Sequence, residues 1–325
     1  NFEGLKTEGN FSVSGFIKGI YNETSIPSFN MSINVDNAMF KYPDLPKAIN
    51  NINITSHISN NGEGLDNTII DISQFSLEMG GAPLNATLNI SHPISDPELI
   101  ASLETTQNLN DIKDFYPLGD EDDLNGELKI DIKLDGRLSS IEQEKYEEFS
   151  ALGYVLATNI SYKSKEFIDP ILIEKAQLNF SPQYLNLVSF NSKIGKSDLS
   201  AKGKITNYVA YYLGKGQLNA SMDISSTYLN IDELFADKVE AMENSSKAKT
   251  ENTKIEQKQY VSSEIIEVPG NINFQLNADM NKLVYDKIEM HNVKGKMIIK
   301  EHTVFLDNLI MDAVDGQMIV DGSYN

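Results

Sequence analysis

Three segments of this chain share one pattern, and that pattern restricts the fold more than any other feature of the sequence. The segments are residues 69–90, 184–205 and 303–324. In each of them apolar side chains recur at every second position, which is typical of a β-strand with one apolar face. The alternation then slips by one residue at the same place in all three copies: from Ile72 to Phe75, from Leu187 to Phe190 and from Leu306 to Leu309. Because a slip would turn the rest of the strand over, we predict a β-bulge or a sharp bend at each of these places.

A turn signal and a second alternating run follow each slip. The turn residues are Gly80-Gly81, Gly195-Lys196 and Asp315-Gly316, and residues of these types tolerate the positive φ angles of tight hairpins. The sequence therefore predicts one bulged β-hairpin, used three times.

The apolar residues of the first strand in each hairpin form the predicted binding surface. They are Ile70, Ile72, Phe75 and Leu77 in the first copy, Leu185, Leu187, Phe190 and Ile194 in the second, and Val304, Leu306, Leu309 and Met311 in the third. Since these side chains fall in register when the copies are aligned, we expect them to lie on one face of the sheet.

The remaining sequence predicts further strands and a division into repeats. We predict a first β repeat over residues 1–120, a second over 121–236 and an incomplete third over 263–325, because strand patterns recur in the same order. Residues 237–262 are rich in Lys, Glu, Asn and Ser and nearly lack large apolar residues, which favours a flexible polar linker.

The one convincing helix signal lies near residues 140–151. Ser139 or Ser140 is a suitable N-cap, acidic residues follow, and Ile141, Phe149 and Leu152 form one stripe at helical spacing. A short helical turn is also expected around residues 109–116. The predicted fold class is thus mainly β: an elongated, curled antiparallel sheet of repeated bulged hairpins, with one or two short helices.

Composition and motifs argue against several functions. The formal net charge of -20 disfavours nucleic acid, which requires clustered Lys and Arg. The chain has no Cys, and its four histidines, His57, His92, His291 and His302, lack metal-ligand spacing. No nucleophile or paired carboxylate occurs in a catalytic context. We therefore expect a protein that is not an enzyme, with no catalytic residues, no metal site and no cofactor.

Two arrangements fit an array of strands with an apolar face and little helix to cover it. In one, the repeats cover one another as an ordinary sandwich or solenoid core. In the other, the bulges curl the sheet into a groove whose apolar floor stays open for a ligand. The sequence leaves both open.

The chain resembles the AsmA family of Gram-negative envelope proteins over essentially its whole length. The resemblance lies in KYPDLPKAINNINITSHI at residues 41–58, the first hairpin, the run at 126–136, the segment at 149–155 and the final hairpin. These motifs are degenerate patterns of apolar and Gly positions.

The resemblance implies a fold, a location and a function. Such proteins extend into the periplasm as an elongated β-groove, are anchored in the inner membrane by an N-terminal helix, and take part in outer-membrane biogenesis by moving phospholipid. We therefore expect the twelve apolar residues named above to bind phospholipid or another acyl-chain ligand, and envelope assembly proteins to be possible partners. No membrane anchor occurs in this sequence, so we expect a fragment of a longer protein. The competing expectation is a non-enzymatic envelope scaffold or spacer that binds protein partners.

Overall fold

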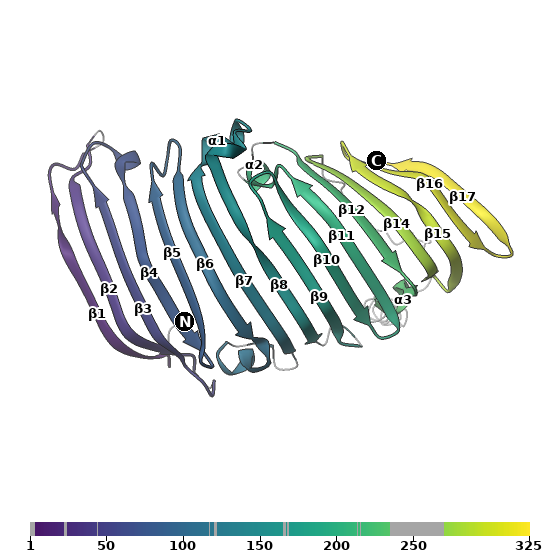
Figure 1. Ribbon diagram of the computed structural model, residues 1–325, viewed down its shortest axis with the longest axis horizontal. Coiled ribbons are helices and arrows are strands. Elements are labelled where there is room, and N and C mark those ends of the chain that lie inside the picture. Colours follow the sequence, from purple (N-terminus) through teal and green to yellow (C-terminus); the bar gives the residue numbers. More distant parts are fainter. Residues whose placement is uncertain are drawn as a thin grey trace, which may run out of the picture.

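The computed structural model of this protein is one curled β-sheet of seventeen strands (Figure 1). It describes residues 4–22, 25–43, 45–116, 118–119, 122–164, 167, 169–212, 214, 216–234 and 270–325. The strands alternate apolar and polar residues, so each strand has one apolar face and one polar face. The predicted fold class, a mainly β protein with a curled sheet and few short helices, is confirmed.

The first half of the chain contributes β1 (Lys6–Lys18), β2 (Ser28–Lys41), β3 (Ile49–Asn60), β4 (Ile69–Met79), β5 (Ala82–Ser91), β6 (Glu98–Asn108), β7 (Asp123–Arg137) and β8 (Phe149–Lys163). The second half contributes β9 (Ile171–Phe180), β10 (Tyr184–Ile194), β11 (Ser197–Thr206), β12 (Leu218–Ser226), β13 (Leu229–Asn230), β14 (Ile272–Tyr285), β15 (Ile288–Lys300), β16 (Thr303–Ala313) and β17 (Gly316–Tyr324). The helices are α1 (Leu138–Glu142), α2 (Tyr208–Tyr212) and α3 (Ile231–Leu234), with 3₁₀ turns at Leu65–Asn67, Leu109–Asp114 and Tyr146–Glu148. The helical turn expected after residue 108 is therefore present.

Neighbouring strands pair in chain order, and every pair is antiparallel except at one junction. There, β14 runs parallel to β12 and β13, with Leu218 paired to Ile272 and Leu229 to Leu283. The prediction of a purely antiparallel sheet was wrong at this point. Apolar alternation is the same in parallel and antiparallel strands, so the sequence pattern carries no sign of the strand direction.

The predicted irregularity, a β-bulge or a sharp bend, is present in all three copies and takes the form of a register shift. The register shifts between Ile72 and Phe75, between Leu187 and Phe190, and between Leu306 and Leu309. Two of the predicted turns are also in place, but the third is displaced by one residue. Val314 and Asp315 form it, with φ angles of 50° and 60°, and Gly316 already pairs with Ala313.

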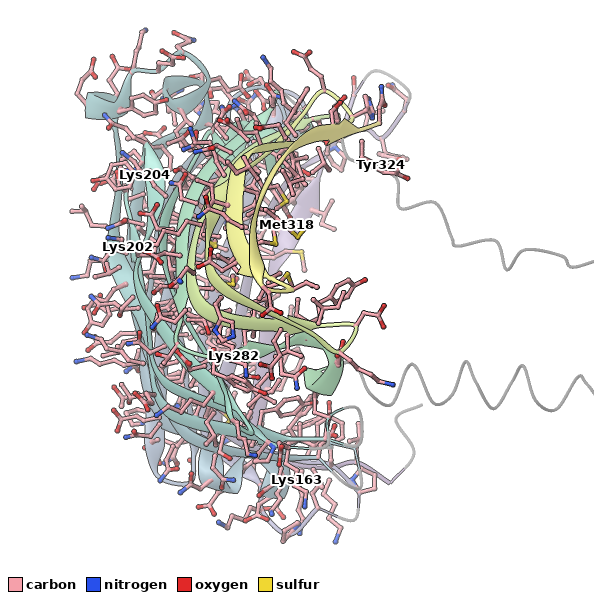
Figure 2. The ribbon with its side chains drawn as sticks, turned by 90° about the vertical axis from the view of Figure 1, so that its right-hand side faces the viewer. Lys163, Lys202, Lys204, Lys282, Met318 and Tyr324 are labelled. Carbon is pink, nitrogen blue, oxygen red and sulfur yellow. The ribbon has the colours of Figure 1, made fainter. Side chains whose placement is uncertain are left out.

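The sheet curls into a trough that is C-shaped when it is viewed along its long axis (Figure 2). Two features of the sequence produce this curvature. Five asparagines in the left-handed region, Asn37, Asn51, Asn159, Asn292 and Asn308, lie within register shifts, with φ between 49° and 52°; Asn tolerates this conformation and bulges bend strands.

Glycines at close backbone approaches are the second feature. Gly153, with φ 140°, lies so close to β7 that an added Cβ would be 2.0 Å from the carbonyl oxygen of Asp131. A residue with a side chain cannot occupy this position without moving the two strands apart. Glycine kinks of this kind let a sheet bend sharply.

The predicted helix near residues 140–151 was wrong over most of its length. α1 ends at Glu142, and β8 begins at Phe149. The reason is the alternation of Phe149, Ala151 and Gly153, which places all three on the apolar face of β8 and pairs them with β7. Pairing along β8 provides more burial than an isolated helix of this length, so tertiary packing overrides the local helical stripe.

Burial is shallow throughout the described part of the chain. No large side chain there is fully buried. This is expected of a single sheet, because no second layer covers its side chains. Two small clusters are the exceptions. At one rim, Ile141 and Phe149 pack around Ala151 beside α1 and α2, and near the C-terminal end Met280, Val293 and Met311 pack together.

The proposed repeats do not interrupt the sheet. β6 and β7 pair across the predicted boundary at residue 120, with Asn108 opposite Glu127. The predicted linker at 237–262 lies outside the described residues, and the division into repeats stays a prediction.

Candidate functional site: the concave face

Cross-strand pairs line up into continuous apolar rows along the trough. The Phe75 row consists of Phe11, Val35, Ile54, Phe75, Ala86, Leu103, Ile132, Gly153, Phe180, Leu185, Ile205, Ala220, Phe274, Ile299, Val304 and Tyr324. It crosses from β1 to β17 without a charged or hydrogen-bonding side chain other than the terminal tyrosine hydroxyl. An apolar row thus runs along one face of the sheet from end to end.

A second row runs beside the first. The Leu77 row consists of Leu77, Leu84, Thr105, Ile130, Val155, Leu178, Leu187, Gly203, Met222, Leu276, Met297 and Leu306. Its one polar member, Thr105, is buried, donates to the carbonyl oxygen of Pro83 at 2.9 Å and contacts Gln107 Nε2 at 2.7 Å. Because Thr105 has partners within the sheet, it leaves no unsatisfied group for a ligand.

The rows lie on the concave side of the sheet. Met318, which alternates with Tyr324 along β17, points into the hollow, whereas Lys202 and Lys204 project from the opposite side (Figure 2). The two lysines alternate with Gly203 and Ile205, which belong to the rows. The hollow of the trough is therefore its apolar side.

All twelve residues predicted from the sequence lie on this face, and eleven of them are half-buried. Met311 is the exception, with 7% of its surface exposed in the cluster near the C-terminal end. The second and third hairpins place equivalent residues in one row, as with Leu185 and Val304, but the first hairpin is offset from them. Phe75 is in one row with Leu185 and Val304, whereas Phe190, its counterpart in the sequence alignment, pairs with Ala176 and Ala201.

The alternative of a sandwich or solenoid core, in which the repeats cover one another, does not describe this structure. The described strands form one sheet, and no second sheet of described residues lies opposite its apolar face. An apolar groove of about 490 Å³ lies on this face, lined by residues that include Leu185, Leu187, Ile205, Ala220, Phe274 and Ile299. This volume is within the range of small-ligand pockets, roughly 300–1,000 Å³.

Small residues keep the floor of this groove low. Gly203 lies in it, and a Cβ there would come within 2.6 Å of the carbonyl oxygen of Ser221 on β12. Ala220 is flanked in the Phe75 row by Ile205 and Phe274. The larger side chains of Ile205 and Phe274 therefore form the sides of the groove, and the small residues Gly203 and Ala220 form its floor.

The sequence prediction missed most of this surface. Ile205, Ala220, Phe274 and Ile299 lie outside the first strands of the three hairpins, which were the source of the predicted residues. Their own alternation was the available signal, since every strand presents one apolar side. What the alternation could not supply was the register that joins one strand to the next.

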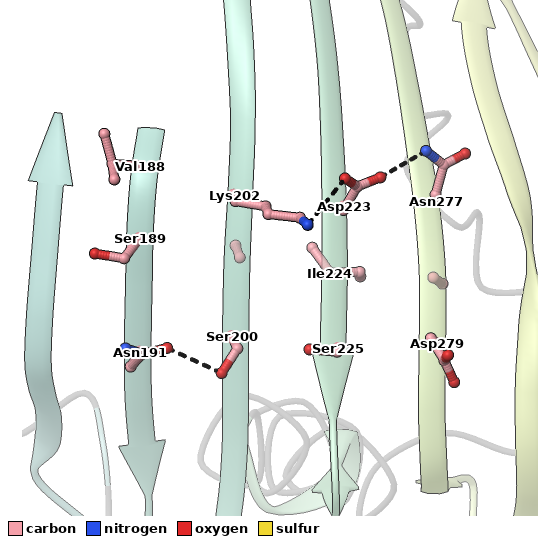
Figure 3. A pocket seen from close by; sticks show the side chains of 12 residues that line it. Val188, Ser189, Asn191, Ser200, Lys202, Asp223, Ile224, Ser225, Asn277 and Asp279 are labelled. Carbon is pink, nitrogen blue, oxygen red and sulfur yellow. Dashed lines mark hydrogen bonds and ion pairs between the residues drawn. The ribbon is translucent and has the colours of Figure 1, made fainter. Parts of the chain in front are cut away.

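The convex face is mainly polar. Figure 3 shows a shallow depression on it, where Asp223 accepts a hydrogen bond from Asn277 at 2.7 Å and lies 4.0 Å from Lys202, and Asn191 accepts one from Ser200 at 3.1 Å. Exposed ion pairs of this kind contribute little to stability. The depression combines small amide, hydroxyl and charged groups without an aromatic side chain, and it does not resemble an acyl-chain site.

Aspartates hold the rim turns in place. Asp66 accepts hydrogen bonds from the backbone amides of Ile94 and Ser95 and from the Ser95 hydroxyl. The Ser95 hydroxyl is the main cause that lowers the pKa of Asp66.

Asp96 in the same way accepts hydrogen bonds from the Ser139 amide at 3.0 Å and from the Ser139 hydroxyl at 2.8 Å. The Ser139 amide is the main cause that lowers the pKa of Asp96. These contacts fix α1 and the neighbouring turns at the edges of the trough.

Other classes of site find little support in the described residues. Among them, no group of three or more His, Cys, Asp or Glu side chains is placed to hold a metal ion. Within the same residues, no helix has the length and apolar character needed to span a bilayer. Comparisons with protein-family models, curated proteins and solved structures find no match to this chain.

Proposed function

We propose that the concave face binds the acyl chains of phospholipid or a similar lipid, as in a periplasmic β-groove protein of the AsmA type that acts in outer-membrane biogenesis. The proposal includes a periplasmic location and an inner-membrane anchor that belongs to a longer form of the protein. Its main support is the Phe75 row, an apolar path that runs through sixteen cross-strand positions from Phe11 to Tyr324. A ligand that is apolar along its whole length, such as a hydrocarbon chain, is complementary to such a path.

The geometry favours a ligand that lies along the trough and moves. Each buried methylene contributes about 0.8 kcal/mol, so ten methylenes covered on one side contribute on the order of 4 kcal/mol. The loss of translational and rotational freedom offsets most or all of this gain. Neighbouring positions along a row offer similar contacts, so a chain can shift along the groove without leaving the apolar surface.

The first test is extraction of the purified protein with organic solvent, followed by mass spectrometry for phospholipid. A fluorescent fatty acid provides the quantitative probe. The Ala220→Phe variant fills the floor of the groove between Ile205 and Phe274. We expect it to weaken binding of the probe by at least about fivefold. Ser225→Phe places the same side chain on the exposed convex side of the same strand, outside the groove, and serves as the matched control.

A lipid-free extract, together with probe binding that is absent or equal in both variants, would contradict the proposal. The competing function is a non-enzymatic envelope scaffold that binds protein partners. The observation that favours it is the exposure of the outer edges of β1 and β17, which have a strand partner on one side only among the described residues.

A further inference from the structure

The outer edge of β1 is long and apolar, and no described strand covers it. All thirteen residues of β1 are exposed, and among the described residues β1 pairs only with β2. Between Glu8 and Lys18 the strand has no charged residue and no proline, the features that normally block pairing at a sheet edge. Phe11, Val13 and Ile17 are 70%, 48% and 67% exposed. Such an edge is suited to accept another strand.

The sequence of β1 is complementary to itself in one antiparallel register. In this register Val13 lies opposite Val13 of the second copy, and the two-fold axis passes between them. Any two residues whose numbers add to 26 are then opposite each other. Opposite residues lie on the same face of the sheet. On the apolar face, Phe11 then lies opposite Gly15 and Ile17 opposite Gly9. A large side chain thus covers a glycine at four symmetric places, an arrangement that stabilises edge glycines.

The other side of the strand, on which Phe16 lies opposite Asn10, is compatible with the same register. Glu8 lies opposite Lys18 at both ends of the pairing, and Ser12 lies opposite Ser14. Opposite charges across a strand pair are stabilising, and like charges are destabilising. A shift by two residues in one direction places Lys6 opposite Lys18 and Phe11 opposite Val13. A shift in the other direction places Phe11 opposite Ile17 and leaves Glu8 without Lys18.

We infer that two copies of this chain pair through β1 in the Val13 register, as an isologous dimer. The two-fold axis is perpendicular to the sheet, so both concave faces open on the same side. At Phe11 the Phe75 row of one copy meets the row of the second copy that contains Gly15, Met31 and Ile58. The edge strand β17 lacks this complementarity, because Asp321 has no basic partner within Gly316–Tyr324. The inference does not depend on which ligand the concave face binds.

The test uses the absence of cysteine from the chain. In the proposed register the Cα atoms of the two copies of residue 13 are about 4.5–5.5 Å apart, within the range for a disulfide. The two copies of residue 12, and those of residue 14, are diagonal and roughly 7–8 Å apart. Under mild oxidation we expect Val13→Cys to form a covalent dimer, while Ser12→Cys and Ser14→Cys cross-link more slowly.

A charge exchange tests the same register without a covalent cross-link. Sedimentation equilibrium is expected to show a dimer of the native chain, weakened roughly fivefold by Lys18→Glu. Glu8→Lys combined with Lys18→Glu restores opposite charges and is expected to restore dimerisation. Circular dichroism of each variant checks that the sheet is intact. A monomeric native chain, fastest cross-linking at residue 12 or 14, or head-to-tail polymers through β17 would each overturn the inference.

Discussion

Phe75 of β4 and Leu185 of β10 lie in one unbroken row of the concave face, joined through five intervening strands by cross-strand pairs. They come from different copies of the repeated hairpin and from different positions within it. The row exists because every strand keeps its apolar side toward the hollow despite the bulges.

Phe190→Asp is expected to reduce binding of a fluorescent fatty acid at least about tenfold, because it places a charge on the apolar floor. The unfolding free energy is expected to fall by only about 1–3 kcal/mol, since Phe190 is half-buried. Val188→Asp, on the same strand and 42% exposed, is the control and is expected to retain binding. Complete unfolding of the Phe190 variant would instead indicate a closed core.

Gly153→Ala is expected to destabilise the sheet by about 2–4 kcal/mol, measured by urea denaturation. The added Cβ would lie 2.0 Å from the carbonyl oxygen of Asp131, and the φ of 140° is unfavourable for alanine. Gly322→Ala is the matched control, because no atom lies within 4 Å of its Cβ position. Equal stability of the two variants would show that the backbone approach at Gly153 does not limit the curvature.

Val314→Asn is expected to stabilise the protein by about 0.5–1 kcal/mol. Val314 has a φ of 50° in the turn between β16 and β17 and is 85% exposed, and a β-branched residue is disfavoured in this conformation. Val314→Ala keeps the left-handed conformation unfavourable and is expected to gain less. Thermal unfolding of the three proteins gives the order, and a loss of stability in the Asn variant would contradict this account of the turn.

Asp96→Asn is expected to make stability less dependent on acidic pH. Because hydrogen bonds from Ser139 hold the pKa of Asp96 below its ordinary value, the charged form stabilises the folded state above the unfolded pKa of about 3.9. That contribution is lost as the pH falls through the lower folded value. The native protein should therefore lose more stability than the variant between pH 5 and pH 2 (about the range over which an aspartate titrates).

Ser139→Ala removes the side-chain donor to Asp96 and is expected to reduce the acid dependence in the same direction. Thermal unfolding at a series of pH values measures both variants. An unchanged acid dependence in both would show that Asp96 does not hold α1 against the rim.

The sequence was sufficient for local features and insufficient for those that depend on neighbours. The irregularity after Leu187 could be predicted, because a slip in alternation requires a β-bulge or a sharp bend to keep the apolar residues on one face. The turn at Val314 was displaced, since Gly316 is the more usual turn residue by type. Phe149 was assigned to a helix because its spacing from Ile141 is helical, and only pairing with β7 decides otherwise.

The binding surface shows the same limit. Phe75, Leu187 and Val304 were identified from their own strands, and the structure places all of them on the concave face. That Phe75 aligns with Leu185 and not with Phe190 depends on the register of five intervening strands. No pattern within one hairpin contains this information, because each bulge and each glycine kink shifts the next strand along its axis.

A sheet without a second layer has a mechanical and evolutionary consequence. Each strand from β2 to β16 is held mainly by its immediate neighbours, so cohesion is a sum of local contacts, as in solenoid proteins. Loss of order is then expected to start at β1 or β17 and proceed inward pair by pair. For the same reason, gain or loss of one hairpin in the gene is expected to change the length of the trough and to leave its width unchanged.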